Sequence, residues 1–120
     1  MMPTIKNNQI VIGMKSKNFE VNDVIVAQVE GDYIIKRIKF KEGDKIFYHF
    51  DKDETLPILI DDLEFHKQLN NKNHWMLQKI IVAKNRFYLL GDNLPASDDS
   101  RRFGQIDKDS LKYKIIFPRF

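Results

Sequence analysis

Short apolar segments separated by turn-forming residues recur along this chain. The segments are rich in Val, Ile, Tyr and Phe, residue types that favour β-strands. The pattern predicts eight strands, at residues 9–14, 24–29, 32–40, 45–50, 56–60, 75–83, 86–90 and 112–117. Residues 41–44 lie between two of these strands and predict a hairpin turn in which Gly43 supplies the positive φ.

One segment has the spacing of a helix. In residues 61–70, Leu63, His66 and Leu69 would share one face, and the acidic pair at its start favours helix initiation. Many short strands with at most one short helix predict a mainly β fold of the barrel or sandwich type. Because the chain has 120 residues, we expect a single domain spanning 1–120.

The composition excludes several classes of function. Hydrophobic residues at 42% and charged residues at 31% indicate an ordinary soluble globular protein. The net charge of +3 is small and both signs are interspersed, so we expect no nucleic-acid partner. The absence of cysteine excludes disulfides and thiol catalysis, and the three histidines lack ligand spacing. We therefore expect no metal and no cofactor. No apolar run approaches the ~20 residues that a membrane-spanning helix needs.

The predicted strand 32–40 places a lysine on an otherwise apolar face. Strand alternation assigns four residues to this face, namely Ile34, Lys36, Ile38 and Phe40. Arg37 would point the other way. Lys36 either extends its ammonium group to water or is desolvated, and the pattern alone favours the first interpretation. A desolvated lysine favours the neutral amine, which can act as a general base.

Residues 91–104 form a polar segment directly after the apolar strand 86–90. The segment contains two glycines, a proline, three aspartates, two serines and two arginines. A solvated turn is one interpretation, but polar loops mounted on strand ends often carry function. Asp99 and Arg101 are two residues apart, a spacing at which opposite charges can brace an irregular backbone. Ser97 and Ser100 are candidate hydroxyl groups.

Four segments, taken in order, resemble the bacterial type I signal peptidases. The family's box of Gly-Asp-Asn, a few variable residues, Ser-X-Asp-Ser-Arg and Gly is matched by Gly91, Asp92, Asn93, Ser97, Asp99, Ser100, Arg101 and Gly104. Residues 33–37 and 42–44 resemble the family's Lys-Arg segment, which ends in Gly-Asp. Residues 22–26 are similar to its Gly-Asp-hydrophobic box, with Asn22 in place of Gly, and residues 1–5 resemble Ser-Met-X-Pro-Thr-Leu.

The resemblance implies a serine endopeptidase with a Ser/Lys dyad, on the mainly β, barrel-type fold shared with the self-cleaving SOS repressors. Lys36 would be the general base, and Ser97 would hydrogen-bond and orient its amine. Asp99 would pair with Arg101 and Arg37. Asp92 and Asn93 would support the loop. Ile34, Ile38 and Phe40 could supply the apolar wall that keeps a base amine neutral.

The same resemblance implies the partners and the location. Signal peptides of secreted pre-proteins would be the substrates, in a cleft lined by Met1, Pro3, Ile34 and Ile35. An N-terminal anchor would hold the domain at the membrane surface, on the extracytoplasmic side of the cell membrane.

One departure concerns the nucleophile. The family's nucleophilic serine immediately precedes the methionine that aligns with Met1, a position outside the sequence. Either the serine and a membrane anchor precede this segment, or both were removed together, or the chain is a pseudopeptidase that binds signal peptides or a partner. We favour truncation because Lys36, Ser97, Asp99 and Arg101 are all retained, and we expect the chain as given to be inactive or nearly so.

A self-cleaving repressor is a further alternative. That branch shares the fold and the dyad, but it lacks the loop seen at 91–104, and the sequence contains no helix-turn-helix segment for DNA.

Overall fold

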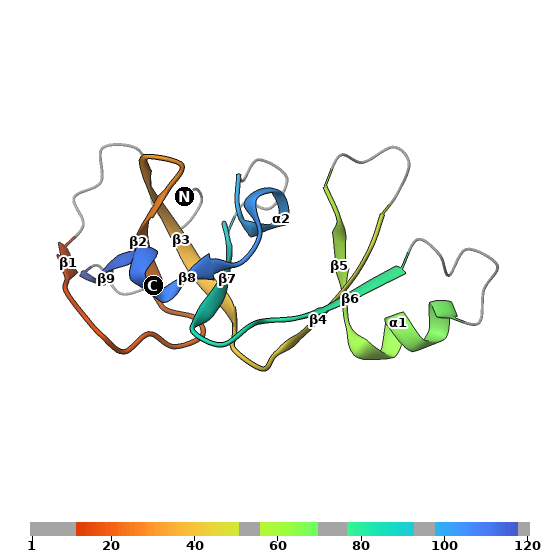
Figure 1. The fold of residues 1–120 in the computed structure, drawn as a ribbon. Helices are drawn as coiled ribbons and strands as arrows, with labels where there is room; N and C mark the ends of the chain where they lie inside the picture. Colours follow the sequence, from red (N-terminus) through yellow and green to blue (C-terminus); the bar gives the residue numbers. More distant parts are fainter. Residues whose placement is uncertain (1–11, 51–55, 70–76, 93–97, 118–120) are drawn as a thin grey trace.

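The computed structural model describes residues 12–50, 56–69, 77–92 and 98–117. These residues form antiparallel strands in two sheets, with two short α-helices and one 3₁₀ turn (Figure 1). The strands are β1 Ile12–Met14, β2 Val24–Val29, β3 Asp32–Lys41, β4 Lys45–His49, β5 Ile58–Ile60, β6 Leu77–Ile81, β7 Arg86–Leu90, β8 Ile106–Asp107 and β9 Leu111–Phe117. The helices are α1 Asp62–Leu69 and α2 Ser100–Phe103, and the 3₁₀ turn η3 spans Lys108–Ser110.

All eight predicted strands are present among the described residues, although residues 50, 56–57 and 82–83 of the predicted ranges lie outside the strands. Strands β2 and β7 have the predicted bounds, and the hairpin turn between β3 and β4 places Gly43 at φ 85°. Residues 9–11 and 75–76 of two predicted strands lie outside the described residues. The two-residue strand β8 and the turn η3 were not predicted, because neither is long enough to show a periodic pattern.

The large sheet has the strand order β1-β9-β2-β3-β7-β8, and the small sheet has the order β5-β4-β6. Figure 1 shows the small sheet and α1 lying to one side of the large sheet. The mainly β prediction is confirmed, but as open sheets, since the described strands do not close either sheet into a barrel. A second helix, α2, exceeds the one expected. It forms because Asp99 caps its first turn by accepting a hydrogen bond from the Arg101 amide.

A register shift in β3 changes one predicted face. Arg37 lies opposite Leu90 and Ile38 opposite Leu89, but Phe40 lies opposite Tyr88. One extra residue is therefore inserted in β3 between Ile38 and Phe40, as in a β-bulge. The bulge turns Phe40 to the opposite face, so the prediction that Phe40 shares a face with Lys36 is wrong.

Two hydrophobic clusters lie on opposite faces of β7. The first joins residues of the large sheet, namely Ile25, Ala27, Ile38, Phe87, Leu89, Ile106 and Leu111. The second contains Ile46, Val82, Tyr88 and Leu90, with partly buried Phe40, Tyr48, Leu59 and Ile80 packed against it. Because its residues come from both sheets, the second cluster packs the small sheet against the large one.

Helix α1 is confirmed, and the two leucines that the spacing placed on one face are exposed. Leu63 is 80% exposed and Leu69 is 41% exposed. Phe65 makes the inward contact instead, with its ring 4.7 Å from that of Phe47 on β4. The side chain of Asp61 accepts the amide hydrogen of Glu64 at 2.7 Å, which caps the start of the helix.

Candidate functional site

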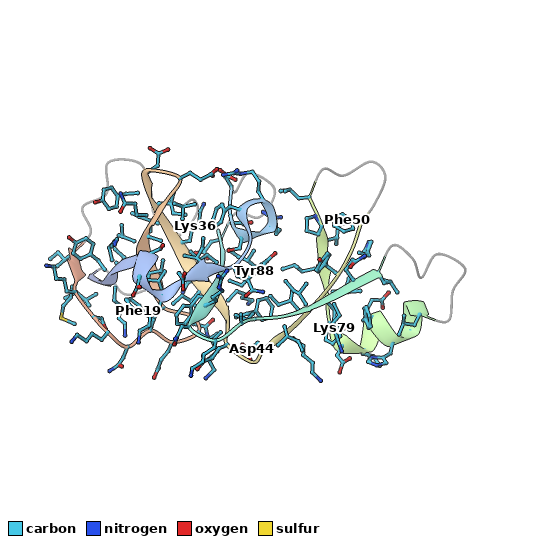
Figure 2. All side chains as sticks on the ribbon, viewed as in Figure 1. Phe19, Lys36, Asp44, Phe50, Lys79 and Tyr88 are labelled. Carbon is cyan, nitrogen blue, oxygen red and sulfur yellow. The ribbon has the colours of Figure 1, made fainter. Side chains whose placement is uncertain are left out.

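Lys36 lies in the middle of the large sheet, on strand β3 (Figure 2). It is half-buried and sits opposite Ile25 of β2. Ile38 belongs to the first cluster and Ile34 packs against that cluster. With Phe40 turned away, Ile34, Ile38 and Ile25 form the apolar surroundings of the lysine. Arg37 points to the other face, as alternation predicts.

The loop after β7 is held by a fully buried carboxylate. Asp99 has 0% exposure and accepts hydrogen bonds from Nε and Nη2 of Arg101, at 2.8 and 3.0 Å. It also accepts the backbone amides of Arg101 and Gly91, at 3.1 and 3.2 Å. A buried carboxylate needs such a complete set of donors, because an unpaired one is very costly. Asp99 therefore ties both ends of the loop together.

Arg37 pairs with Asp92 rather than with Asp99. Its Nε and Nη2 donate to the two carboxylate oxygens of Asp92 at 3.0 and 3.1 Å, and Nη1 donates to the Asn22 carbonyl at 2.9 Å. Asp99 does not pair with Arg37, because Arg101 already donates hydrogen bonds to both of its carboxylate oxygens. The Arg37 fork thus joins β3, the start of the loop and the turn before β2.

Asn22 occupies a position that requires an unusual backbone. Its φ is 79°, in the left-handed region that glycine and asparagine tolerate best. Its amide donates to the Ile38 carbonyl at 2.8 Å. The replacement of the family's glycine by asparagine at this position is therefore compatible with the local conformation.

Ser100 is a buried structural hydroxyl. Its Oγ accepts the amide hydrogen of Leu89 at 2.8 Å, which links α2 to β7. The α2 helix ends at Gly104, whose φ is 82° and whose amide donates to the Ser100 carbonyl at 2.8 Å. Ser100 and Gly104 thus fix the path of the chain leaving the loop.

A third aspartate–arginine pair lies on the surface of the same loop. Arg102 donates from Nε and Nη2 to the carboxylate of Asp98, and its Nη2 also lies 2.5 Å from Oε1 of Glu30. The hydrogen bond from Arg102 lowers the pKa of Asp98, and the positive charge of Lys36 lowers it further. Sequence reasoning missed these residues. The four-residue spacing of Asp98 and Arg102 was a usable signal, whereas Glu30 is 72 residues from Arg102.

Tyr88 lies on the opposite face of β7 from the Lys36 surroundings. It is 3% exposed, and burial raises the pKa of its phenol to about 12, with a further contribution from the negative charge of Asp99. It belongs to the second cluster.

Four of the predicted site residues, Met1, Pro3, Asn93 and Ser97, lie outside the described residues. Of the predicted cleft residues, Ile34 and Ile35 are partly buried on β3. Strand β7 pairs with β3 only over 37–41, so β3 residues 32–36 pair with β2 alone among the described strands.

The described residues include no helix that is long and apolar enough to cross a membrane. They also include no group of three or more His, Asp or Glu side chains placed to hold a metal ion.

The described residues define a mainly β protein in which strand β3, which carries Lys36, lies beside a charged loop. Comparison with known proteins identifies the family. The model of the family described as signal peptidase, peptidase S26, matches residues 1–120. The chain therefore belongs to the signal peptidase family.

Individual relatives agree with this assignment. The chain is similar to signal peptidase IB of Staphylococcus aureus strain Mu50, with 33% identity over 141 residues, covering 98% of this chain and 71% of the relative. It is 30% identical to signal peptidase I of Buchnera aphidicola subsp. Baizongia pistaciae over 117 residues, covering 94% of this chain and 35% of the relative. A crystal structure of a signal peptidase I from Enterococcus faecalis V583 shares the fold, with a TM-score of 0.53 at 20% identity, covering 82% of this chain and 97% of that one.

Proposed function

We propose that this chain is the catalytic domain of a type I signal peptidase, which cleaves signal peptides from secreted pre-proteins with a Ser/Lys dyad. The observation that carries the proposal is the setting of Lys36, which stands among Ile25, Ile34 and Ile38 on a central strand. The family resemblance assigns the general base to this position, and a lysine amine can take a proton in that role. The family membership supports the reaction class.

In the proposed reaction, the nucleophile is a serine immediately before the Met1 position. The Lys36 amine takes the hydroxyl proton as the serine oxygen attacks the scissile carbonyl carbon. The resulting ammonium returns that proton to the departing amine, leaving an acyl-enzyme. A water molecule then attacks the ester carbonyl carbon as Lys36 takes one of its protons, and Lys36 returns that proton to the serine oxygen as the free acid leaves. Ser97 is proposed to orient the Lys36 amine by a hydrogen bond.

A supporting role in this proposal falls to three loop residues, Asp92, Asp99 and Arg101, and to Arg37 on β3. Asp99 and Arg101 close the loop, and Arg37 with Asp92 holds its first residues against β3. General-base catalysis depends on such fixed placement, because a small displacement of a catalytic group costs a large fraction of the rate.

The substrate is proposed to bind as an added strand. Residues 32–36 of β3 have one ladder edge that β7 does not cover, and an extended peptide can pair with such an edge. Ile34 and Ile35, with Met1 and Pro3, would line the pockets for the side chains next to the cut. The domain would work on the extracytoplasmic side of the membrane, held there by an anchor.

The test uses the chain extended by a serine before Met1 and an anchor, incubated with a pre-protein. We expect cleavage at the signal-peptide junction, and a loss of about 10²–10⁴-fold in kcat/KM for Lys36→Ala. Lys39→Ala is the matched control, because Lys39 is an exposed lysine on the same strand. It should cleave at the rate of the unchanged protein.

Two outcomes would overturn the proposal. Robust cleavage by the Lys36→Ala variant would remove the dyad assignment. Binding of the signal peptide without cleavage by the extended chain would instead support a pseudopeptidase.

A further inference from the structure

A pocket lies at the end of the large sheet that is farther from the loop after β7. Its volume is about 390 Å³, and it is lined by the β1–β2 connection, the end of β3, the start of β7 and the turn η3. Lys41 of β3 lies opposite Phe87 of β7 at this end of the ladder. Arg37 lies opposite Leu90 at the other end, where the loop begins. The pocket is therefore separate from the Lys36 site.

The walls of the pocket are tied to one another. The ring of Phe19, in the β1–β2 connection, packs edge-on against the ring of Phe87 with 6.3 Å between the centroids. The amide of Asn85 donates to the Glu42 carboxylate at 2.9 Å. The Asn85 carbonyl accepts the amide hydrogen of Lys108 at 2.8 Å. Because these contacts join all four lining segments, the pocket is already formed, as small-molecule sites usually are.

The charged side chains that line the pocket are mostly cationic. Four are basic and two are acidic, a formal excess of two positive charges, namely Lys17, Lys41, Arg86 and Lys108 against Glu20 and Glu42. All four cations are exposed. Among the described residues, no salt bridge joins any of the four to a carboxylate. Asp107 lies opposite Arg86 in the β7–β8 pair but does not line the pocket. The excess positive charge is therefore available to an anionic ligand.

We propose that this pocket binds a phosphate monoester. Such a group carries about −1.5 to −2 charges at pH 7, which matches the excess of two positive charges. Arginine and lysine are the usual donors to phosphate oxygens. The volume lies within the range of roughly 300–1,000 Å³ that is typical of small-molecule sites, so the ligand is larger than a bare phosphate ion. The rings of Phe19 and Phe87 line the same pocket and offer an apolar surface to the carbon part of the ester.

Two sources share this chemistry. A soluble ester such as glycerol phosphate carries the group on a small polar molecule, and phosphatidic acid carries it as a lipid headgroup at a membrane surface. The proposal goes beyond the proposed function and does not rest on it, because neither molecule contains a peptide bond and binding needs no serine nucleophile.

The experiment with the soluble ester follows backbone amide NMR signals of the chain during titration with glycerol phosphate at pH 7. We expect saturable changes at the amides that border the pocket, namely those of Asn85, Arg86, Phe87 and Lys108. Glycerate is the matched anion, since it carries a single carboxylate charge, and it should bind more weakly. Equal binding of the two anions would contradict the assignment of a phosphate monoester.

Paired double variants separate the pocket from the general charge of the protein. Arg86→Gln with Lys108→Gln removes two cations of the pocket and should weaken binding by about tenfold or more, the effect of losing one or two hydrogen bonds to a charged group. Lys67→Gln with Lys79→Gln removes the same charge from exposed positions on α1 and β6 and should leave the affinity unchanged. Equal losses in the two double variants would reduce the binding to non-specific attraction and overturn the proposal.

The experiment with the lipid source measures sedimentation of the chain with vesicles of phosphatidylcholine, alone and mixed with phosphatidic acid. Binding to the mixed vesicles that the pocket variant loses and the control variant keeps would assign the site to a lipid headgroup. Saturable binding of glycerol phosphate without vesicle binding would assign it to a soluble ester.

A negative result with both probes would overturn the proposal. Unchanged amide signals at the pocket, together with no difference between the two vesicle compositions, would show that the pocket does not bind this group. Thermal unfolding of each variant is recorded first. Should the pocket variant fail to fold, Lys17→Gln with Lys41→Gln replaces it, and the same loss of binding is required.

Discussion

The two sheets differ in the polar side chains that they bury. The large sheet supports a loop that buries Asp99 and Ser100 at 0% and 2% exposure, and the three aspartates of this loop each pair with an arginine. Among the described residues, the small sheet and α1 bury no polar side chain, whereas both sheets carry exposed apolar side chains, such as Ile58 and Ile81 on the small sheet and Ile12 and Ile116 on the large one. Figure 2 shows Lys36 on the large sheet, with Phe50 and Lys79 at the small one.

The difference follows from how the strands are covered. Strand β7 has a hydrophobic cluster on each face, so its end is a fixed platform for a charged loop. Strands β5 and β6 each have only one paired edge within the described small sheet. Precise placement of charged groups requires rigid support, which explains why the candidate site lies on β3 and the loop after β7.

The largest expected effect tests the buried carboxylate. Asp99→Ala leaves the Arg101 guanidinium and the Gly91 amide without their acceptor, so we expect a loss of about 3–5 kcal/mol in the free energy of unfolding. Urea unfolding followed by circular dichroism measures it. Asp109→Ala removes an exposed carboxylate and should change stability by less than about 0.5 kcal/mol. Equal effects of the two substitutions would contradict the assigned role of Asp99.

The next prediction compares a leucine from each region. Leu89 is fully buried on β7, whereas Leu63 is 80% exposed on α1. Leu89→Ala should cost about 2–5 kcal/mol through lost burial and the remaining cavity, and Leu63→Ala should cost less than about 0.5 kcal/mol. The same unfolding measurement checks both. A large cost of Leu63→Ala would mean that Leu63 is more closely packed than its 80% exposure implies.

A smaller effect is expected at the forked pair that joins β3 to the loop. Arg37→Lys keeps the positive charge but cannot make the bidentate contact with Asp92 or the additional bond to the Asn22 carbonyl. We expect a loss of about 1–2 kcal/mol. The matched control is Arg86→Lys, at an exposed arginine on β7, which should be neutral. If Arg37→Lys leaves the free energy of unfolding unchanged, the positive charge alone is enough to hold this part of the loop.

The smallest effect appears only in alkali and concerns Tyr88. Its pKa is raised to about 12 in the folded protein, from ~10 in an unfolded chain. The folded state therefore holds its proton longer, and stability falls as the pH rises from about 10 to about 12. Tyr88→Phe should flatten this fall, whereas Tyr33→Phe, at a 66% exposed residue, should not. Phenol absorbance and melting temperature are recorded together over this pH range. Ionisation of the Tyr88 phenol near its ordinary pKa of ~10 in the folded protein would contradict the prediction.

Local patterns predicted most of the strands because apolar and polar residues alternate along them. They also indicated Lys36 among isoleucines and the close spacing of Asp99 and Arg101. They failed where a single extra residue changed the register, as at Phe40. They predicted α1 but did not indicate how it packs, because Phe65 contacts Phe47 on strand β4, which is distant in sequence.

The sequence by itself determined the mainly β class, the turn at Gly43 and the family box from Gly91 to Gly104, since these depend on residue type and on short spacings. Only the tertiary structure decided which arginine holds which aspartate. Arg37 and Asp92 are 55 residues apart, and Glu30 and Arg102 are 72 apart. Contacts across such separations depend on how the strands pair, because pairing and the bulge in β3 decide which side chains meet.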